Sequence, residues 1–259
     1  MTALIEQTLT NLRTLGLNDL AQTIEDMRSN PSQQDLPCYD QLGIAVDIEI
    51  QARATKKLNR LIKQAKFKID ACPEDINYRV KRGLDRQVMA NLLSCDYLEK
   101  HLNVVFTGPT GSGKTHLACA LGQQATRKGF SVLYTRLSRL LEDLEVAHAD
   151  GSLPTVRNRL SKKDLLILDD WALSPLTSTG RQELLEIIDD RLGKSSIMIT
   201  SQLPIDQWHV YLGEVTIADA ILDRIVHSAH ILKLSGESMR KKMSPIKAGQ
   251  RAGKGVDND

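Results

Sequence analysis

Apolar residues recur every three to five positions from residue 2 to residue 28, and this spacing predicts two short amphipathic helices. Gly16 interrupts the pattern, and Asn18 stands where it could cap the second helix. Residues 29–37 are polar and contain two prolines, so they predict a connector. From Asp40 to about Lys68 the apolar residues again follow a helical spacing. This part of the chain therefore predicts a small, all-helical bundle.

After Pro73 the pattern changes, because short apolar runs begin to alternate with helical stretches. A helix is expected broadly over Ile76–Lys100, and the apolar run Asn103–Thr107 ends in a glycine-rich turn, as buried parallel strands do. The alternation predicts an α/β fold with a doubly wound parallel sheet. Further strands are expected at 131–135, 165–168, 196–200 and 231–234, and further helices at 114–128, 137–147, 153–161, 179–192 and around 220–227.

The pattern along the chain predicts three regions. Residues 1–70 are expected to form a helical domain, residues 71–246 the α/β domain, and residues 247–259, which are rich in Gly, Lys and Asp, a disordered tail. The boundaries follow the change of pattern after Pro73 and the loss of apolar residues near the end of the chain.

Composition narrows the class of protein. The chain has 259 residues, 41% of them hydrophobic, and a mean hydropathy of −0.26, which are values of ordinary globular domains. No apolar run approaches ~18 residues, so no membrane span and no membrane partner are expected. The start lacks the pattern of a signal peptide, and four scattered cysteines have no metal-ligand spacing. We therefore expect a cytoplasmic protein with reduced thiols.

Gly108–Thr115 has the spacing G-x-x-x-x-G-K-[ST], and it stands between an expected strand and an expected helix. Glycines let the backbone curl so that its amides face a phosphate group, while the following helix adds its positive end. Lys114 is expected to reach the β- and γ-phosphates, and Thr115 to offer its hydroxyl to Mg²⁺. The residues expected to bind ATP are Gly108, Pro109, Thr110, Gly111, Ser112, Gly113, Lys114, Thr115 and the adjoining His116.

Two carboxylates follow the apolar run 165–168, at the edge of the sheet where ligands of parallel sheets bind. Asp169 is expected to hold Mg²⁺, usually through water, and Asp170 to accept a proton from the attacking water or to orient it. An acidic turn after a strand is common on its own. The spacing from the P-loop favours the functional interpretation, in which the chain hydrolyses ATP.

Two further polar groups are candidates for the same site. After the strand 196–200, Gln202 is the first candidate to sense the γ-phosphate, with Ser201 and Thr200 as alternatives. All three could equally be ordinary strand-end residues. Arg224 lies in an amphipathic stretch and could reach the ATP site of the next subunit, or simply pair with a neighbour such as Asp223.

Basic residues form three groups that could contact DNA phosphates, with an affinity that falls steeply with salt. The largest runs from Arg53 to Lys68 and contains seven cations and no acid, although a solvated helix face explains it equally well. Aromatic residues make up only 4% of the chain, which favours backbone contact and DNA deformation over base stacking. The other two groups are Arg157, Arg159, Lys162 and Lys163, and Arg136 with Arg139.

Several stretches together resemble the IstB-type insertion-sequence transposition helpers, which are AAA+ ATPases related to DnaC and DnaA. The resemblance extends from the helical N-terminal region to Arg240. Its more discriminating pieces are Asp-Arg-Ile-Val-His at 223–227 and Gly-Glu-Ser-Met-Arg at 236–240; the others are Gly-Pro-Thr-Gly-Ser-Gly-Lys-Thr-His-Leu-Ala, Leu-Ile-Leu-Asp-Asp-Trp and Thr-Ser-Gln-Leu-Pro.

The resemblance implies a DNA-stimulated AAA+ ATPase that assembles on duplex DNA with ATP, remodels the DNA and recruits a partner transposase. It implies a homo-oligomer with ATP sites at subunit interfaces, where Arg224 matches the arginine finger. The first 70 residues would serve DNA binding or assembly. No separate C-terminal lid is expected, since the chain after Arg224 is short, and Arg240 is the remaining candidate for a second sensor arginine.

Three other functions must be distinguished from that of a transposition helper. A helicase loader of the DnaC kind would take a replicative helicase as its partner. A small-molecule P-loop kinase would be a monomer with a lid, without a basic N-terminal helix or an arginine acting in trans. A transposase is disfavoured, because the nucleotide site explains the paired acids and no helix-turn-helix is clear.

Overall fold

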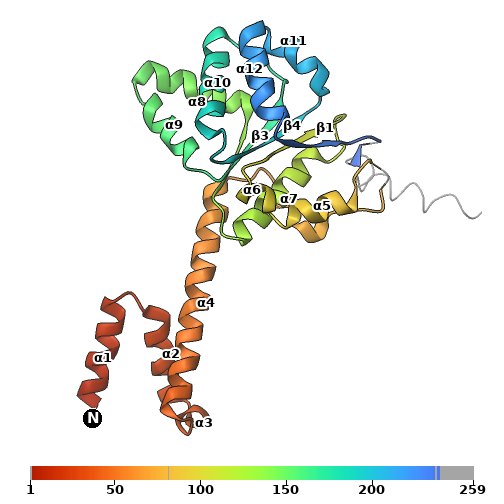
Figure 1. Ribbon diagram of the computed structural model, residues 1–259. Coiled ribbons are helices and arrows are strands. Elements are labelled where there is room, and N and C mark those ends of the chain that lie inside the picture. The colour runs from red at the N-terminus through yellow and green to blue at the C-terminus, as the bar shows by residue number, and fades with distance from the viewer. Residues whose placement is uncertain (1, 81, 237, 240–259) are drawn as a thin grey trace, which may run out of the picture. The chain divides into compact units, whose positions relative to one another are not determined.

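The computed structural model describes residues 2–80, 82–236 and 238–239 (Figure 1). It contains two compact units, and the boundary between them falls after Arg60, inside helix α4 (Cys38–Ala65). Residues 61–70 therefore belong to the second unit. The boundary lies ten residues earlier in the chain than the one expected near residue 70. Arg240 and the tail 247–259 lie outside the described residues.

The first unit consists of helices, as the periodicity predicted. Buried apolar side chains join α1 (Thr2–Thr14), α2 (Asn18–Ser29) and the first part of α4. The connector expected at 29–37 contains a further short helix, α3 (Pro31–Gln34), which the side chain of Asn30 caps by accepting a hydrogen bond from the Ser32 amide at 3.2 Å. The buried apolar residues of this unit include Leu9, Leu20, Ala21, Met27 and Ala45.

The prediction that Asn18 caps α2 is wrong. Asn18 is the first residue of the helix, Leu17 precedes it, and no side chain at that position caps the helix. The buried carboxylate of Glu49 on α4 instead accepts a hydrogen bond from the Leu20 amide at 2.9 Å. A free amide in the first turn of a helix needs an acceptor, and here a residue distant in sequence supplies it.

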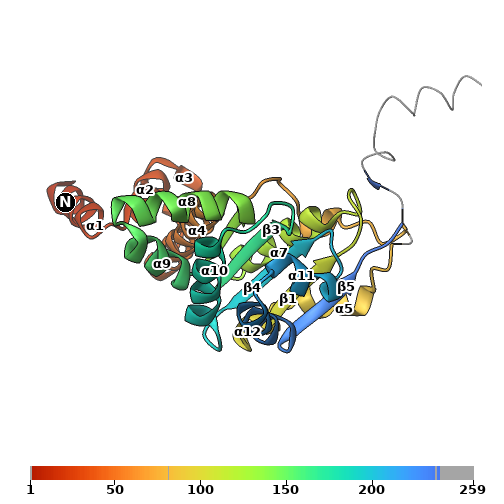
Figure 2. The ribbon, with the colours of Figure 1, turned by 90° about the horizontal axis from the view of Figure 1, so that it is seen from above.

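The second unit contains a five-stranded parallel sheet, which confirms the expected α/β fold (Figure 2). Its strand order is β2-β3-β4-β1-β5. The first strand in sequence, β1, lies inside the sheet, and later strands are added on both sides of it, as in doubly wound folds. The strands are β1 (Asn103–Thr107), β2 (Val132–Arg136), β3 (Leu165–Trp171), β4 (Ser196–Ser201) and β5 (Ala229–Lys233).

Helices cover both faces of this sheet, and each face has its own apolar core (Figure 1). Successive strand residues point to opposite faces, so Val104 and Phe106 enter one core and Val105 enters the other. One face carries α5 (Arg86–Leu93), α6 (Asp96–Glu99) and α7 (Lys114–Arg127). The other carries α8 (Leu137–Asp150), α9 (Leu153–Ser161), α10 (Ser178–Arg191), α11 (Trp208–Leu212) and α12 (Val215–Val226).

The long helix predicted over Ile76–Lys100 is wrong, because the described residues of that stretch contain only α5 and α6 as α-helices. A short 3-10 turn at Pro73–Asp75 precedes it, and α5 begins only after Asp85, whose carboxylate accepts hydrogen bonds from the first-turn amides. Cys95 has a left-handed backbone with φ 66° and separates the two helices. A left-handed residue cannot continue an α-helix.

No helix among the described residues is long and apolar enough to cross a membrane. The last strand ends at Lys233 and the described chain ends at Met239, so the region in which a lid would follow is outside the described residues.

Candidate nucleotide-binding site

The P-loop, defined here as Gly108–Gly113, joins the end of β1 to the start of α7. It lies at the carboxyl ends of the strands, where ligands bind in open parallel sheets. Gly111 has φ 83° and Gly113 has φ 97°, a backbone region that residues with a Cβ rarely adopt. The first turn of α7 directs its amides toward this loop, as an anion-binding helix start does.

Lys114 is buried, with 8% of the residue exposed. Its Nζ donates hydrogen bonds to the carbonyl oxygens of Gly108 at 2.7 Å and Pro109 at 3.0 Å. The ammonium is therefore held by the loop itself, at the place where the motif binds phosphate oxygens. Phosphate oxygens are stronger acceptors for an ammonium than neutral carbonyls are.

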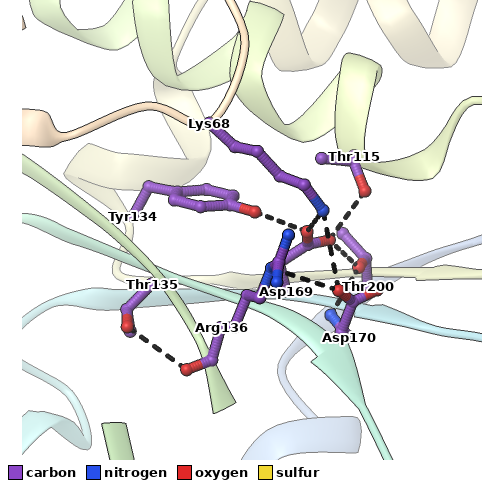
Figure 3. Close-up of polar contacts among 8 residues, drawn as sticks. All are labelled: Lys68, Thr115, Tyr134, Thr135, Arg136, Asp169, Asp170 and Thr200. Atoms are coloured by element: carbon purple, nitrogen blue, oxygen red, sulfur yellow. Dashed lines mark hydrogen bonds and ion pairs between the residues drawn. The ribbon is translucent and has the colours of Figure 1, made fainter. Parts of the chain in front are cut away.

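Asp169 is the centre of the polar network drawn in Figure 3 and is fully buried. One carboxylate oxygen accepts hydrogen bonds from the hydroxyls of Thr115 at 2.8 Å and Thr200 at 2.5 Å. The other accepts one from Tyr134 at 2.5 Å and lies 3.4 Å from Nζ of Lys68. Burial acts to raise the pKa of Asp169, but the three hydroxyls and the Lys68 charge outweigh it, so the pKa lies below its usual range.

Asp170 brings its carboxylate to the same cation as Asp169 because β3 is irregular at this point. Neighbouring side chains of a regular strand point to opposite faces, but β3 carries a register shift against β4 between Leu168 and Trp171. Asp170 itself has a left-handed backbone with φ 59°. Its carboxylate lies 3.6 Å from Nζ of Lys68 and 3.6 Å from Nε of Arg136.

The three γ-phosphate candidates after β4 have different surroundings. The Gln202 side-chain oxygen accepts a hydrogen bond from the Thr110 hydroxyl of the P-loop at 2.6 Å. Thr200 instead donates to Asp169. The Ser201 hydroxyl donates to the Trp171 carbonyl at 3.3 Å and accepts from the Leu203 amide at 3.1 Å, which holds two chain segments together. Of the three, the Gln202 side chain contacts the P-loop directly.

Arg224 lies far from the P-loop of its own chain. Its backbone carbonyl accepts a hydrogen bond at 3.2 Å from Asn103, the first residue of β1, while the P-loop follows the last residue of that strand. The guanidinium forms an ion pair with Asp189 on α10, not with Asp223, which pairs with His227. Arg224 is thus at the opposite edge of the sheet from Lys114.

Three residues of this site were not predicted from the sequence. Tyr134 and Lys68 bind Asp169, and nothing in the local pattern of Tyr134 indicates a polar partner. Arg82, which is 4% exposed, donates to the Ser112 carbonyl at 3.2 Å, and its Nε has no partner among the described residues. Burial lowers the pKa of Arg82, and burial together with Arg82 lowers the pKa of His116. Arg82 was not predicted to contact the P-loop because its segment was expected to be helical.

The basic groups are only partly free for DNA. In the run from Arg53 to Lys68, Arg53 pairs with Glu49, Lys56 pairs with Asp19, and Lys68 pairs with the site carboxylates. Other members of the three groups are also paired within the chain: Arg157 with Glu183 and Glu186, Arg139 with Glu142 and Asp143, and Arg136 with Asp170.

Six basic residues, some of them paired with acids, line a groove of about 950 Å³. We call it the basic groove; it lies within the second unit, along β2 and the starts and ends of neighbouring helices. Glu142 and Asp143 are its acidic lining residues, so cations outnumber acids. Its cations come from all three basic groups and are Lys66, Lys68, Arg136, Arg139, Arg159 and Lys163.

Comparisons with known proteins identify the family of this chain. Residues 10–246 match the family described as IstB-like ATP binding protein. The chain is 44% identical over 238 residues to a Sinorhizobium fredii protein named as an insertion sequence ATP-binding protein, covering 92% of this chain and 97% of that one. It is 31% identical over 231 residues to the IS21 ATP-binding protein of Pseudomonas aeruginosa, covering 89% and 87%.

Solved structures share the fold of the second unit at low sequence identity. The DnaI structure has a TM-score of 0.56 at 20% identity, covering 63% of this chain and 90% of that chain. AMPPCP-bound DnaA from Aquifex aeolicus has a TM-score of 0.55 at 19% identity, covering 72% and 56%. The second unit therefore shares its fold with DnaI and with DnaA. Since the family match spans most of the sequence and includes the P-loop and both carboxylates, the chain belongs to the IstB-like ATP-binding family of insertion sequences.

Proposed function

We propose that this protein binds ATP with Mg²⁺ at the P-loop and hydrolyses it. The observation that carries the proposal is the 2.8 Å hydrogen bond between the Thr115 hydroxyl and Asp169, which joins the P-loop to the strand carboxylates. A hydroxyl and a carboxylate side by side are oxygen donors of the kind that Mg²⁺ prefers. The donor set therefore fits the metal that P-loop enzymes use.

Each residue of the site then has a defined task. Lys114 exchanges its two loop carbonyls for phosphate oxygens, while the first turn of α7 supplies amide donors. Mg²⁺, when bound, neutralises charge on the phosphates. Asp170, with 30% of its side chain exposed, is open to water and orients the attacking water or accepts its proton. Gln202 reaches the γ-phosphate region through its contact with Thr110.

We further propose that the site is completed by a second copy of the chain. Arg224 lies at the edge of the sheet opposite its own P-loop, so it cannot contact its own nucleotide without unfolding the sheet between them. A head-to-tail assembly would place that edge against the P-loop of the next copy. This supports the role of arginine finger that the sequence suggested, and it implies a homo-oligomer.

Duplex DNA is the proposed substrate of the assembly, and the basic groove is its proposed contact surface. Six cations around one groove suit a phosphate backbone, and the relatives named for insertion sequences support a role in transposition. We propose that ATP-dependent assembly bends the DNA, and that the assembly recruits and stimulates a partner transposase.

A single set of measurements tests this function. ATP hydrolysis and particle size, measured with and without duplex DNA, are expected to show an ATP-dependent assembly on DNA for the wild-type chain. Lys114→Ala is expected to lose nucleotide binding and assembly, while Lys100→Ala, which removes an exposed lysine remote from the loop, keeps both.

Other outcomes would replace the proposal. A protein that stays monomeric with ATP and DNA but transfers phosphate to a small molecule is a kinase. A protein that ignores duplex DNA and the transposase, but loads a replicative helicase, is a helicase loader.

A further inference from the structure

Two cations belong both to the nucleotide site and to the basic groove. Nζ of Lys68 lies 3.4 Å from Asp169 and 3.6 Å from Asp170, and Nε of Arg136 lies 3.6 Å from Asp170 (Figure 3). Both side chains also line the groove. They come from separate elements, since Lys68 follows the end of α4 and Arg136 ends β2.

The charges of this cluster balance without any metal. Two carboxylates face one ammonium and one guanidinium, so Lys68 and Arg136 are the counter-ions of Asp169 and Asp170. A divalent cation brought to Asp169 makes the two side-chain cations redundant and repels them. Mg²⁺ therefore competes directly with Lys68 for Asp169, and its charge also repels Arg136 beside the neighbouring Asp170.

Lys68 is the contact of Asp169 that a metal ion displaces most easily. The hydroxyls of Thr115, Thr200 and Tyr134 bind Asp169 at 2.5–2.8 Å, whereas the ammonium lies at 3.4 Å. Those hydroxyls are held by strands and by a helix, but Lys68 stands in the segment after α4 with 27% of its side chain exposed. Its ammonium can turn into the groove with little rearrangement.

We propose that Lys68 and Arg136 are shared counter-ions that make DNA binding depend on Mg²⁺-nucleotide. Without the metal they pair with Asp169 and Asp170; with it they turn toward the groove and bind DNA phosphates. This inference rests on the proposed function, because it presumes that Mg²⁺ binds at Asp169 and that DNA lies in the groove.

The coupling is reciprocal, as any coupling between two binding equilibria must be. A DNA phosphate in the groove draws Lys68 and Arg136 away from the acids, so DNA lowers the Mg²⁺ concentration that nucleotide binding requires. The groove offers charge more than stacking surface, since its aromatic side chain, Tyr134, uses its hydroxyl to bind Asp169. The ligand is thus identified by its phosphates and not by its bases.

The test is a Mg²⁺ titration of the binding of a fluorescent, non-hydrolysable ATP analogue, with and without a short DNA duplex. The wild-type protein is expected to reach half-saturation at a lower Mg²⁺ concentration when DNA is present. Lys68→Met is expected to lower the half-saturating Mg²⁺ about fivefold or more without DNA, the lower range of typical coupling, and to reduce the effect of DNA. Lys100→Met serves as the control for removal of one positive charge.

Lys163→Met distinguishes the effect of lining the groove from the effect of contacting Asp169 and Asp170. Lys163 lines the groove, but no ion pair joins it to Asp169 or Asp170 among the described residues. Its substitution is expected to weaken DNA binding by the same factor with and without Mg²⁺-nucleotide. Lys68→Met is expected to weaken it only when Mg²⁺-nucleotide is bound.

Different failures have different meanings. If the wild-type protein binds no nucleotide, or binds it without regard to Mg²⁺, the proposed function fails. If nucleotide binding depends on Mg²⁺ but Lys68→Met leaves the half-saturating concentration unchanged or raises it, the shared counter-ion is refuted and the function stands. The shared counter-ion is also refuted if DNA at saturation leaves the half-saturating Mg²⁺ concentration of the wild-type protein unchanged.

Discussion

The hydroxyl of Tyr134 donates a 2.5 Å hydrogen bond to the fully buried carboxylate of Asp169. Burial, followed by this contact with Asp169, raises the pKa of Tyr134, and the same contact helps to lower the pKa of Asp169. A buried carboxylate without such donors would tend to be protonated and would lose its value as a metal ligand. Tyr134 is therefore a positioning residue that keeps Asp169 ionised.

Tyr134→Phe is expected to destabilise the second unit by about 1.5–3 kcal/mol at pH 7, the usual contribution of a hydrogen bond to a charged group. Urea unfolding followed by tryptophan fluorescence measures it, because both tryptophans, Trp171 and Trp208, lie in that unit. Tyr211→Phe is the matched control. Its hydroxyl donates to the neutral Ser174 carbonyl at 2.9 Å, so a smaller loss, about 0.5–1.5 kcal/mol, is expected.

The effect of Tyr134→Phe also depends on pH. The folded-state pKa of Asp169 is lowered, so the stability due to its ionised form is fully present above the unfolded pKa of about 3.9 and is lost as the pH falls through the folded pKa. The difference between wild type and Tyr134→Phe should stay constant from about pH 7 to pH 5 and shrink below about pH 4. A Tyr134→Phe effect that does not change across this range would contradict the assignment.

Gln202→Ala is expected to slow ATP hydrolysis about 100-fold, as loss of one well-placed polar group at a transition state does, while nucleotide affinity changes little. Single-turnover hydrolysis and equilibrium binding of an ATP analogue separate the two effects. Ser201→Ala is the matched control, since its hydroxyl joins Trp171 and Leu203 and does not face the P-loop. A slow Ser201→Ala protein beside a normal Gln202→Ala protein would reverse the assignment.

Arg224→Ala is expected to lower hydrolysis in the assembled state by about 10³-fold or more, the usual effect of losing an arginine finger. Its ion pair with Asp189 is partly exposed and contributes about 0–1 kcal/mol, so the fold should survive. Asp189→Asn breaks the same ion pair but keeps the arginine, and it should hydrolyse ATP normally. Loss of hydrolysis in both variants would mean that the ion pair, not the arginine, is required.

Mixed assemblies test whether Arg224 acts on the next copy of the chain. Asp170→Asn, which keeps Lys114 and is expected to keep nucleotide binding and assembly, and Arg224→Ala are each expected to be inactive. When the two are mixed in equal amounts, about a quarter of the head-to-tail interfaces combine an intact Asp170 with an intact Arg224. Hydrolysis should therefore return on mixing, and its absence would exclude a site shared between subunits.

Gly122→Ala tests the packing that positions Lys68. A Cβ at Gly122, within α7, would lie 2.6 Å from the Phe67 ring and 2.8 Å from the end of Ile167. The clash is expected to cost about 1–3 kcal/mol, despite the better helix propensity of alanine. Gly43→Ala, in a helix with open space around the position, should instead stabilise its unit by about 0.5–1 kcal/mol. Urea unfolding followed by circular dichroism compares them, and equal effects would refute the packing argument.

Local pattern was sufficient for most of the fold. Apolar runs bounded by turns located the five strands of the described residues, and the periodicity located α7 to α10 within a few residues. Burial on both faces explains the continuous apolar runs of β1, β3 and β4, whereas β2 and β5 are only partly buried. The P-loop and the two acids were readable because a phosphate-binding turn and a metal-binding strand end need particular residue types at a particular spacing. These features depend on neighbours in sequence, and so the sequence by itself determined them.

Contacts between distant residues decided the rest. Glu49 caps α2 across 29 residues, and Lys68, which stands in a basic run, reaches Asp169 across 101 residues. A left-handed Asp170 and an irregular β3 turn two successive carboxylates toward one ammonium, which strand alternation forbids. Such partners depend on how the elements pack, and no local spacing encodes them. The sequence therefore determined where the nucleotide site is, and only the tertiary structure decided which side chains hold its acids in place.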